Sequence, residues 1–186
     1  MSTDAPGGVI ERRDEAYELD ERLTVVGRRL AVGDAAPAFT LACLDPETDE
    51  MREVSLADSA GDVRLLNVVN SLDTPVCDVE TRRWEQLRAD LPPGVRVYTI
   101  SMDLPFAQAR WRRAGDVAHD ALSAHAGEEF GREYGVLLKE WRLLQRAVFV
   151  VDADGVVVHA EYVADQMTEP DYDAALRAAR TAAGGG

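Results

Sequence analysis

The chain has 186 residues and a mass of 20.4 kDa, room for one domain of ordinary size, and 46% of its residues are hydrophobic, which excludes a disordered chain. Its formal net charge is −14 at pH 7. This excludes a binder of nucleic acids or anionic membranes, because no basic patch would outweigh so negative a field. The two cysteines, Cys43 and Cys77, are too few for a disulfide scaffold or a four-cysteine zinc site.

The charged residues are unusually distributed, since Lys139 is the single lysine among twenty basic residues. An acidic, lysine-poor surface suits a cytoplasm rich in salt, where screening removes the self-repulsion of the surface, and an acidic protein from an ordinary cytoplasm is the alternative. A melting temperature measured against KCl concentration separates the two. The sequence contains no apolar run long enough to cross a membrane and no basic segment followed by an apolar one at its start. We therefore expect a soluble cytoplasmic protein with reduced thiols.

Strand and helix patterns alternate along the chain, without an internal repeat or an interdomain linker. The predicted elements in chain order are strands at 23–26, 38–43 and 63–69, a helix from 75 that ends before 92, a strand at 95–100, helices at 104–113 and 128–134, strands at 147–151 and 156–159, and a helix at 170–182. The turn at 152–155 predicts a hairpin between the last two strands. We expect a flexible N-terminal segment at 1–15, one domain at 16–182 and a flexible glycine tail at 183–186. The order of elements predicts an α/β fold of the thioredoxin-like type, with a mixed central sheet flanked by helices.

Cys77 is the strongest candidate for chemistry, because it falls in the first turn of the helix that follows a buried strand. Thr74 is a good N-cap for this helix, and Pro75 fits its first position. The N–H groups and positive dipole end of a helix N-terminus stabilise a thiolate, and the thiolate is the nucleophilic form of cysteine. A free cysteine is otherwise a small buried hydrophobic residue, which a polar helix terminus does not favour.

Thr74 occupies the place of the first cysteine in a C-x-x-C pair, which excludes dithiol exchange within this motif. Its hydroxyl oxygen can cap the helix while its proton remains free for a small oxygen-containing substrate beside the sulfur. Asp78 works against a thiolate unless its carboxylate points away. A cationic partner is therefore needed, and Arg146 and Arg82 are the two candidates.

Four collinear segments of the chain resemble those of the peroxiredoxins, and specifically the bacterial-type thiol peroxidases within that family. They are Asn70-Ser71-Leu72-Asp73-Thr74-Pro75-Val76-Cys77, Ser101-Met102-Asp103-Leu104-Pro105-Phe106-Ala107-Gln108-Ala109-Arg110, Val32-Gly33-Asp34-Ala35-Ala36-Pro37-Ala38-Phe39 and Thr168-Glu169-Pro170-Asp171-Tyr172-Asp173-Ala174-Ala175-Leu176. The resemblance runs from about residue 18 to 176. It implies a thioredoxin-like fold with an N-terminal β extension, and a homodimer.

The resemblance also implies an activity, which is the reduction of hydrogen peroxide and organic hydroperoxides without a metal or an organic cofactor. Cys77 matches the peroxidatic cysteine of the family, Thr74 its threonine and Arg146 its active-site arginine. On this basis Cys77 attacks the peroxide and becomes a sulfenic acid, while Thr74 holds the substrate and Arg146 stabilises the thiolate and the departing oxygen.

Two departures from the family pattern change the expected mechanism. Asn70 stands where the family has a proline that shields the thiolate, which suggests easier overoxidation. Arg112 stands where the family has its resolving cysteine, and Cys43 matches no site that the family uses. We therefore expect a one-cysteine cycle in which an external thiol, from a thioredoxin-like protein, a glutaredoxin-like protein or a small molecule, reduces Cys77. One alternative is a peroxide-sensing relay protein that passes oxidation from Cys77 to a partner, and another is a protein that retains the fold for binding only.

Overall fold

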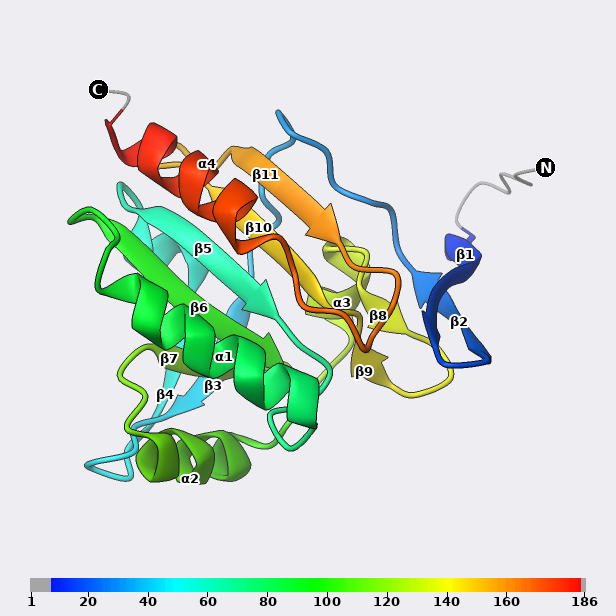
Figure 1. Ribbon diagram of the computed structural model, residues 1–186, viewed down its shortest axis with the longest axis horizontal. Helices are drawn as coiled ribbons and strands as arrows, with labels where there is room; N and C mark the ends of the chain where they lie inside the picture. Colours follow the sequence, from blue (N-terminus) through cyan, green and yellow to red (C-terminus); the bar gives the residue numbers. More distant parts are fainter. Residues whose placement is uncertain (1–7, 185–186) are drawn as a thin grey trace.

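The computed structural model describes residues 8–184 of the chain, and Figure 1 shows them as a twisted central sheet with helices packed against it and a separate strand pair beside it. The strands are β1 (Glu11–Glu18), β2 (Glu21–Val26), β3 (Thr40–Leu44), β4 (Met51–Ser55), β5 (Val63–Val68), β6 (Val95–Ser101), β7 (Asp120–Ser123), β8 (Leu137–Leu138), β9 (Leu143–Leu144), β10 (Ala147–Val151) and β11 (Val157–Tyr162). The helices are the 3-10 helix η1 (Leu56–Ser59) and the α-helices α1 (Pro75–Arg88), α2 (Pro105–Gly115), α3 (Glu129–Glu133) and α4 (Tyr172–Gly184). In this part of the chain, no helix combines the length and the apolar character that a bilayer crossing requires.

The central sheet has seven strands in the order β11-β10-β5-β6-β7-β3-β4. Its β5-β6 and β6-β7 pairs are parallel, whereas the other pairs are antiparallel, so the sheet is mixed. Every residue of β5 is buried, as its nearly continuous apolar run predicts for a strand with both faces covered. The predicted α/β fold with an antiparallel hairpin at one edge is confirmed. Because β5 lies between β10 and β6, the loop that follows it begins beside the start of β10 and the end of β6.

Helices α1 and α4 lie side by side over one face of the sheet (Figure 1). Trp84 of α1 is fully buried there, and its ring lies 4.9 Å from that of Tyr172 in α4, centroid to centroid. The apolar stripe that the sequence predicts for α1 therefore packs against both the sheet and α4. This packing fixes the N-terminus of α1 relative to β5 and β10.

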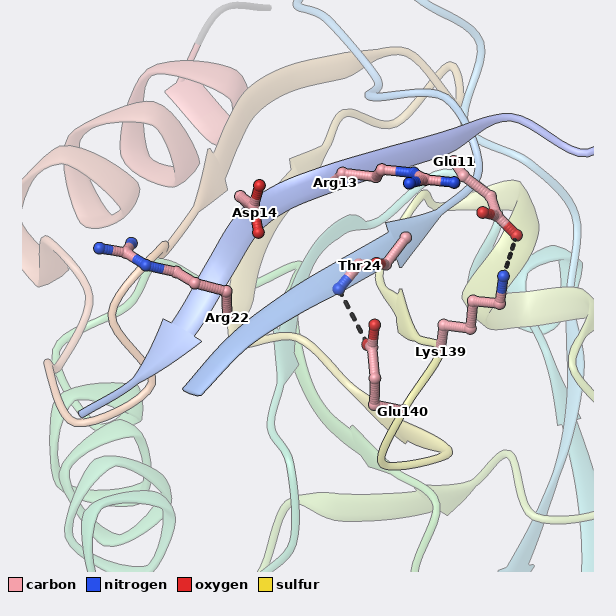
Figure 2. Close-up of a pocket in the computed structure, with 7 residues that line it drawn as sticks. All are labelled: Glu11, Arg13, Asp14, Arg22, Thr24, Lys139 and Glu140. Atoms are coloured by element: carbon pink, nitrogen blue, oxygen red, sulfur yellow. Dashed lines mark hydrogen bonds and ion pairs between the residues drawn. The ribbon is translucent and has the colours of Figure 1, made fainter. Parts of the chain in front are cut away.

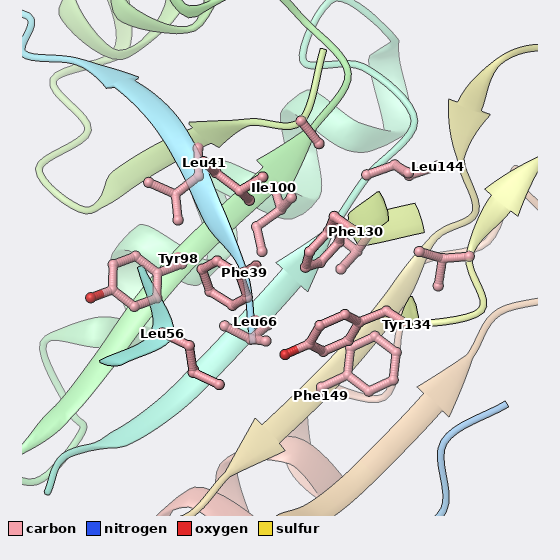
Figure 3. Close-up of a cluster of buried hydrophobic side chains, with 14 of the residues drawn as sticks. Phe39, Leu41, Leu56, Leu66, Tyr98, Ile100, Phe130, Tyr134, Leu144 and Phe149 are labelled. Carbon is pink, nitrogen blue, oxygen red and sulfur yellow. The ribbon is translucent and has the colours of Figure 1, made fainter. Parts of the chain in front are cut away.

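The opposite face of the sheet is closed by an aromatic cluster (Figure 3). Phe130 and Tyr134, at the two ends of α3, stack with centroids 4.4 Å apart. Tyr134 also contacts Phe149 of β10 edge-to-face at 5.3 Å, and its hydroxyl donates to the carbonyl of Pro37. These contacts hold β10 in place, and the residue directly before β10 is Arg146.

The N-terminal segment departs from the prediction. The sequence predicted a flexible segment at 1–15, whereas β1 begins at Glu11 and joins β2, β8 and β9 in a second, four-stranded sheet. Ala16 is the one buried residue of β1, so its apolar pattern was too weak to indicate a strand. Backbone pairing with β2 holds the segment instead. At the other end, α4 includes Ala183 and Gly184 of the predicted flexible tail, and residues 1–7 and 185–186 lie outside the described residues.

Candidate active site

Cys77 lies in the first turn of α1, three positions inside the helix, as the sequence predicted. Its side chain is fully buried among Val69, Leu72 and Ala121. Within the described residues, the backbone N–H groups of Val76 and Cys77 have no acceptor, as expected for the open donors of a helix N-terminus. The sulfur therefore sits where free donors and the positive end of the helix dipole favour an anion.

Thr74 is the N-cap residue by position, but its side chain does not cap the helix. The hydroxyl Oγ1 instead donates its proton to the carbonyl of Ser71 at 2.9 Å. The roles predicted from the sequence were the reverse, with a lone pair that caps the helix and a proton that stays free. The structure leaves the oxygen lone pairs available, so Thr74 can accept a hydrogen bond from a ligand.

Arg146 is the cation that the structure places at the sulfur. Its Nη2 lies 3.4 Å from Cys77 Sγ and donates to the carbonyl of Gln166 at 2.8 Å, and the whole side chain is buried. Its Nη1 pairs with the carboxylate of Glu80, one turn further along α1 than Cys77 and equally buried. Arg146 thus contacts two groups that can carry negative charge, Cys77 and Glu80.

The charges of this buried pair influence each other. Burial raises the pKa of Glu80 to about 7, because the nearby Arg146 compensates only part of the lost hydration. Burial lowers the pKa of Arg146, but the negative charges of Glu80 and Cys77 outweigh that effect and its pKa is raised. Arg146 therefore stays charged, while Glu80 changes its charge near neutral pH.

The second arginine candidate, Arg82, serves a different purpose. Its Nε lies 3.0 Å from the carboxylate of Asp78, and its guanidinium stacks 4.9 Å from the ring centroid of Trp111 in α2. The Asp78 carboxylate also accepts from the indole N–H of Trp111 at 2.7 Å. Asp78 is thus engaged toward α2, which resolves the conflict that a carboxylate next to Cys77 would create.

A pocket of about 280 Å³ opens beside the sulfur. Its lining is mainly apolar and consists of Glu18, Asn70, Thr74, Pro75, Val76, Trp141, Leu143, Gln166 and Met167. Cys77 does not line it, so its sulfur lies behind the wall that Asn70, Thr74 and Val76 form.

Neither of the remaining sequence candidates comes to this pocket. Cys43 lies on β3 and packs in a different cluster of buried side chains from Cys77. Both cysteines are free, and burial raises the pKa of the Cys43 thiol, with the charge of Asp120 adding to the effect. Arg112, which stands at the family's resolving position, is 5% exposed and donates to two carbonyls just beyond the end of α2. It is a buried helix-end anchor, not a surface charge.

A polar pocket of about 530 Å³ lies over the β1-β2 pair, far along the chain from the Cys77 loop (Figure 2). Lys139 pairs with Glu11 at 2.5 Å, and Glu140 accepts from the backbone N–H of Thr24 at 2.8 Å. Among the described residues, Arg13, Asp14 and Arg22 of the same lining form no ion pair, and nothing in the pocket connects it with Cys77.

Sequence reasoning missed two residues that shape the site. Glu80 follows Cys77 at helical spacing on the buried face that continues to Trp84, and a carboxylate at such a position was a detectable signal. Gln166 gave no signal, because it reaches the site from a loop after β11. Its side-chain oxygen accepts from the backbone N–H of Arg146 at 2.9 Å.

Comparison with protein families gives a match to the redoxin family over residues 31–176. The chain is 46% identical to a thiol peroxidase of Bacillus subtilis over 159 residues, which cover 85% of this chain and 92% of that protein. It is likewise 46% identical to a thiol peroxidase of Halalkalibacterium halodurans, over 86% of this chain and 93% of that protein.

Solved structures show the same relationship. A peroxiredoxin-like protein of Aquifex aeolicus superimposes with a TM-score of 0.76 at 30% identity, covering 94% of this chain and 98% of that one. A thiol peroxidase of Chromobacterium violaceum gives a TM-score of 0.74 at 26% identity, covering 86% and 91%. Both likenesses extend over nearly the full length of the matched chains.

Proposed function

We propose that this chain, which belongs to the redoxin family and within it to the thiol peroxidases of the peroxiredoxin type, acts through Cys77 alone. Thiol peroxidases reduce peroxides at the expense of thiols. Arg146 and Thr74 complete the proposed catalytic set. The observation that carries the proposal is the position of Arg146 Nη2, 3.4 Å from a sulfur at the N-terminus of α1.

In the proposed oxidation step, the Cys77 thiolate attacks the hydroxyl oxygen of a peroxide ROOH. An S–O bond forms, the O–O bond breaks, and the alkoxide RO⁻ leaves and takes a proton from solvent, so that sulfur loses two electrons. Thr74 Oγ1 accepts a hydrogen bond from the peroxide O–H, since its own proton is committed to Ser71. Arg146 and the open N–H groups of Val76 and Cys77 stabilise the developing negative charge.

In the proposed reduction step, an external thiol attacks the Cys77 sulfenic acid, which yields a mixed disulfide and water. A second external thiol then releases reduced Cys77 as a new disulfide forms. Cys43 does not take this role, because it packs in the cluster that includes Leu122, whereas Cys77 contacts Ala121, whose side chain lies on the other face of β7. The reducing thiol belongs to a thioredoxin-like protein, a glutaredoxin-like protein or a small molecule.

Peroxide consumption with thioredoxin and thioredoxin reductase, with a glutaredoxin system, or with a small dithiol tests this cycle. We expect sustained turnover with at least one donor, no turnover for Cys77→Ser, and turnover within about twofold of the wild type for Cys43→Ser. Oxidation that stops after one equivalent with every donor would support the sensing relay instead. An unmodified Cys77 after peroxide treatment, measured by intact mass, would contradict both.

The proposal extends to assembly and location. The side chains of Leu104 and Phe106 are 53% and 64% exposed at the start of α2, and Asp103 beside them binds the active-site loop through the backbone N–H of Leu72. This apolar surface supports a homodimer that contacts its partner near the active-site loop. Light scattering checks it, and Phe106→Glu is expected to shift the mass toward the monomer. We also propose a cytoplasmic location, because a cycle that depends on external thiols needs a reducing compartment.

A further inference from the structure

Asn70 follows β5 directly and is 4% exposed, and its side-chain amide is fixed by two acceptors. Its Nδ2 donates to the carbonyl of Leu144 at 2.6 Å and to the side-chain oxygen of Gln166 at 3.0 Å. Both partners accept hydrogen bonds, so they fix the amide nitrogen on their side. The amide oxygen Oδ1 is left facing Cys77 Sγ, at a distance of 3.9 Å.

Gln166 has no freedom to reverse this arrangement. Its Nε2 donates to the carbonyls of Val163 and Ala164 at 2.8 and 3.0 Å. Its Oε1 accepts from the backbone N–H of Arg146 as well as from Asn70. Backbone groups on four residues therefore determine the orientation of both amides, and an acceptor oxygen must face the sulfur.

We propose that Asn70 holds the sulfenic acid of Cys77 in its neutral form and thereby limits its overoxidation. The inference rests on the proposed role of Cys77 as the peroxide-reactive residue, and it assigns to Asn70 the part of guarding the oxidised intermediate. A one-cysteine cycle needs such a guard, because the sulfenic acid must survive until an external thiol arrives.

The chemistry of the second oxidation explains the effect. An ionised sulfenate S–O⁻ attacks a second ROOH, the O–O bond breaks, RO⁻ leaves and is protonated, and sulfur is oxidised by two further electrons to the sulfinate. The neutral S–OH is the poorer nucleophile. Asn70 Oδ1 accepts the S–OH proton but repels a sulfenate oxygen, and a hydrogen bond to the neutral form of an acid disfavours its ionisation.

The geometry suits the sulfenic acid better than the thiol. A gap of 3.9 Å between Cys77 Sγ and Asn70 Oδ1 is long for a thiol hydrogen bond. An oxygen inserted on the sulfur reaches across the same gap with an ordinary O–H···O bond of about 2.7 Å. Asn70 also lines the pocket from which a peroxide approaches, so the new oxygen forms on its side of the sulfur.

Positive charge near the sulfur favours the ionised sulfenate and so opposes the effect of Asn70, but nearby carboxylates partly compensate this charge. Arg146 attracts a sulfenate, whereas the carboxylate of Glu80 binds the same guanidinium and weakens that attraction. Asp78 is engaged by Arg82 and Trp111. The replacement of a shielding proline by Asn70 suggested easier overoxidation from the sequence, and the direction of the amide oxygen leads to the reverse conclusion.

The test compares Asn70→Leu and Asn70→Pro with Gln145→Leu as the matched control. Gln145 is another buried amide that donates to a backbone carbonyl, that of Val163, but has no contact with the sulfur. Each protein is treated with increasing peroxide without a reducing thiol, and mass spectrometry of the Cys77 peptide gives the sulfinic fraction. We expect both Asn70 variants to reach half conversion at a peroxide concentration about fivefold lower than the wild type, the effect of one ordinary hydrogen bond. The control is expected to match the wild type.

Curves for the Asn70 variants that coincide with the wild type, or with an equally sensitised control, would overturn the inference. If wild-type Cys77 forms no sulfenic acid at all, the proposed function fails instead. The two failures are distinguishable, because the first leaves a sulfinic fraction that rises with the peroxide concentration, whereas the second leaves Cys77 as a thiol at every concentration.

Discussion

Replacing Glu80 with glutamine tests how the buried charges set the reactivity of Cys77. The carboxylate of Glu80 and the sulfur of Cys77 both contact the guanidinium of Arg146, so they compete for one positive charge. Glutamine retains an acceptor oxygen for Arg146 but removes the negative charge. We therefore expect the Cys77 thiolate to persist to lower pH in Glu80→Gln, and the pH profile of the peroxide reaction to move toward acid.

The size of this shift follows from the distance and the ionisation of Glu80. Residues three apart on a helix lie about 6 Å from each other, which at an effective dielectric constant of about 20 gives an interaction of about 3 kcal/mol between unit charges, or about two pH units. Because the pKa of Glu80 is about 7, it is roughly half ionised at neutral pH. The expected displacement is therefore about one pH unit.

A single-turnover assay with substoichiometric hydrogen peroxide between pH 5 and 8 measures the displacement. Glu53→Gln, which removes an exposed carboxylate on β4, is the control and should leave the profile unchanged. A profile that stays in place or moves toward alkaline pH would refute the reasoning, since it would mean that Glu80 assists the thiolate by orienting Arg146.

The same substitution predicts a change in stability with pH. The folded-state pKa of Glu80 lies above its unfolded value of 4.5, so the folded protein binds more protons between these values. The contribution of Glu80 to stability is therefore fully present below about pH 4.5 and is lost as the pH rises through about 7, by about 3 kcal/mol. The free energy of unfolding of Glu80→Gln relative to the wild type should rise by this amount across that range. A difference that is constant with pH would contradict the raised pKa.

Three further outcomes are expected. Arg146→Met should slow the reaction with peroxide about tenfold to a hundredfold, because a charge-assisted hydrogen bond contributes about 1.5–3 kcal/mol; a rate within twofold of the wild type would show that Arg146 is not catalytic. Burial lowers the pKa of His119 against the opposing effect of Glu85, so the contribution of His119 to stability is lost as the pH falls below about 6.5. The urea midpoint of His119→Gln should therefore depend less on pH between pH 7 and 5 than that of the wild type. An equal pH dependence of the two midpoints would contradict this. Arg112→Ala should lower the free energy of unfolding by about 2–4 kcal/mol in urea titrations, because two carbonyls beyond α2 lose their donor, while a faster or slower peroxide reaction would reveal a role beyond anchoring.

The local features of the site could be read from the sequence. A buried apolar run, then a threonine and a proline, place Cys77 in the first turn of a helix, because each signal acts within a few residues. Of the two arginine candidates, however, only the packing of β10 against β5 identifies the one beside the sulfur. Arg82 is closer in sequence but faces Trp111.

The sequence did not predict which groups donate and which accept the hydrogen bonds of the site. The role expected for the Thr74 proton was wrong, because the backbone after β5 brings the Ser71 carbonyl within 2.9 Å of its hydroxyl. A weak apolar pattern likewise concealed β1, which is held by backbone pairing with β2 more than by side-chain burial.

The sequence by itself determined the alternation of strands and helices and the position of Cys77 at a helix N-terminus. It also determined that position 112 carries an arginine instead of a second reactive cysteine. These properties depend on residue type and on short-range periodicity. Only the tertiary structure decided which groups face the sulfur, since Asn70 precedes Cys77 in the chain and Arg146 follows it by 69 residues. Their orientations depend on buried hydrogen bonds to distant backbone carbonyls, and such bonds exist only after the sheet and its helices have packed.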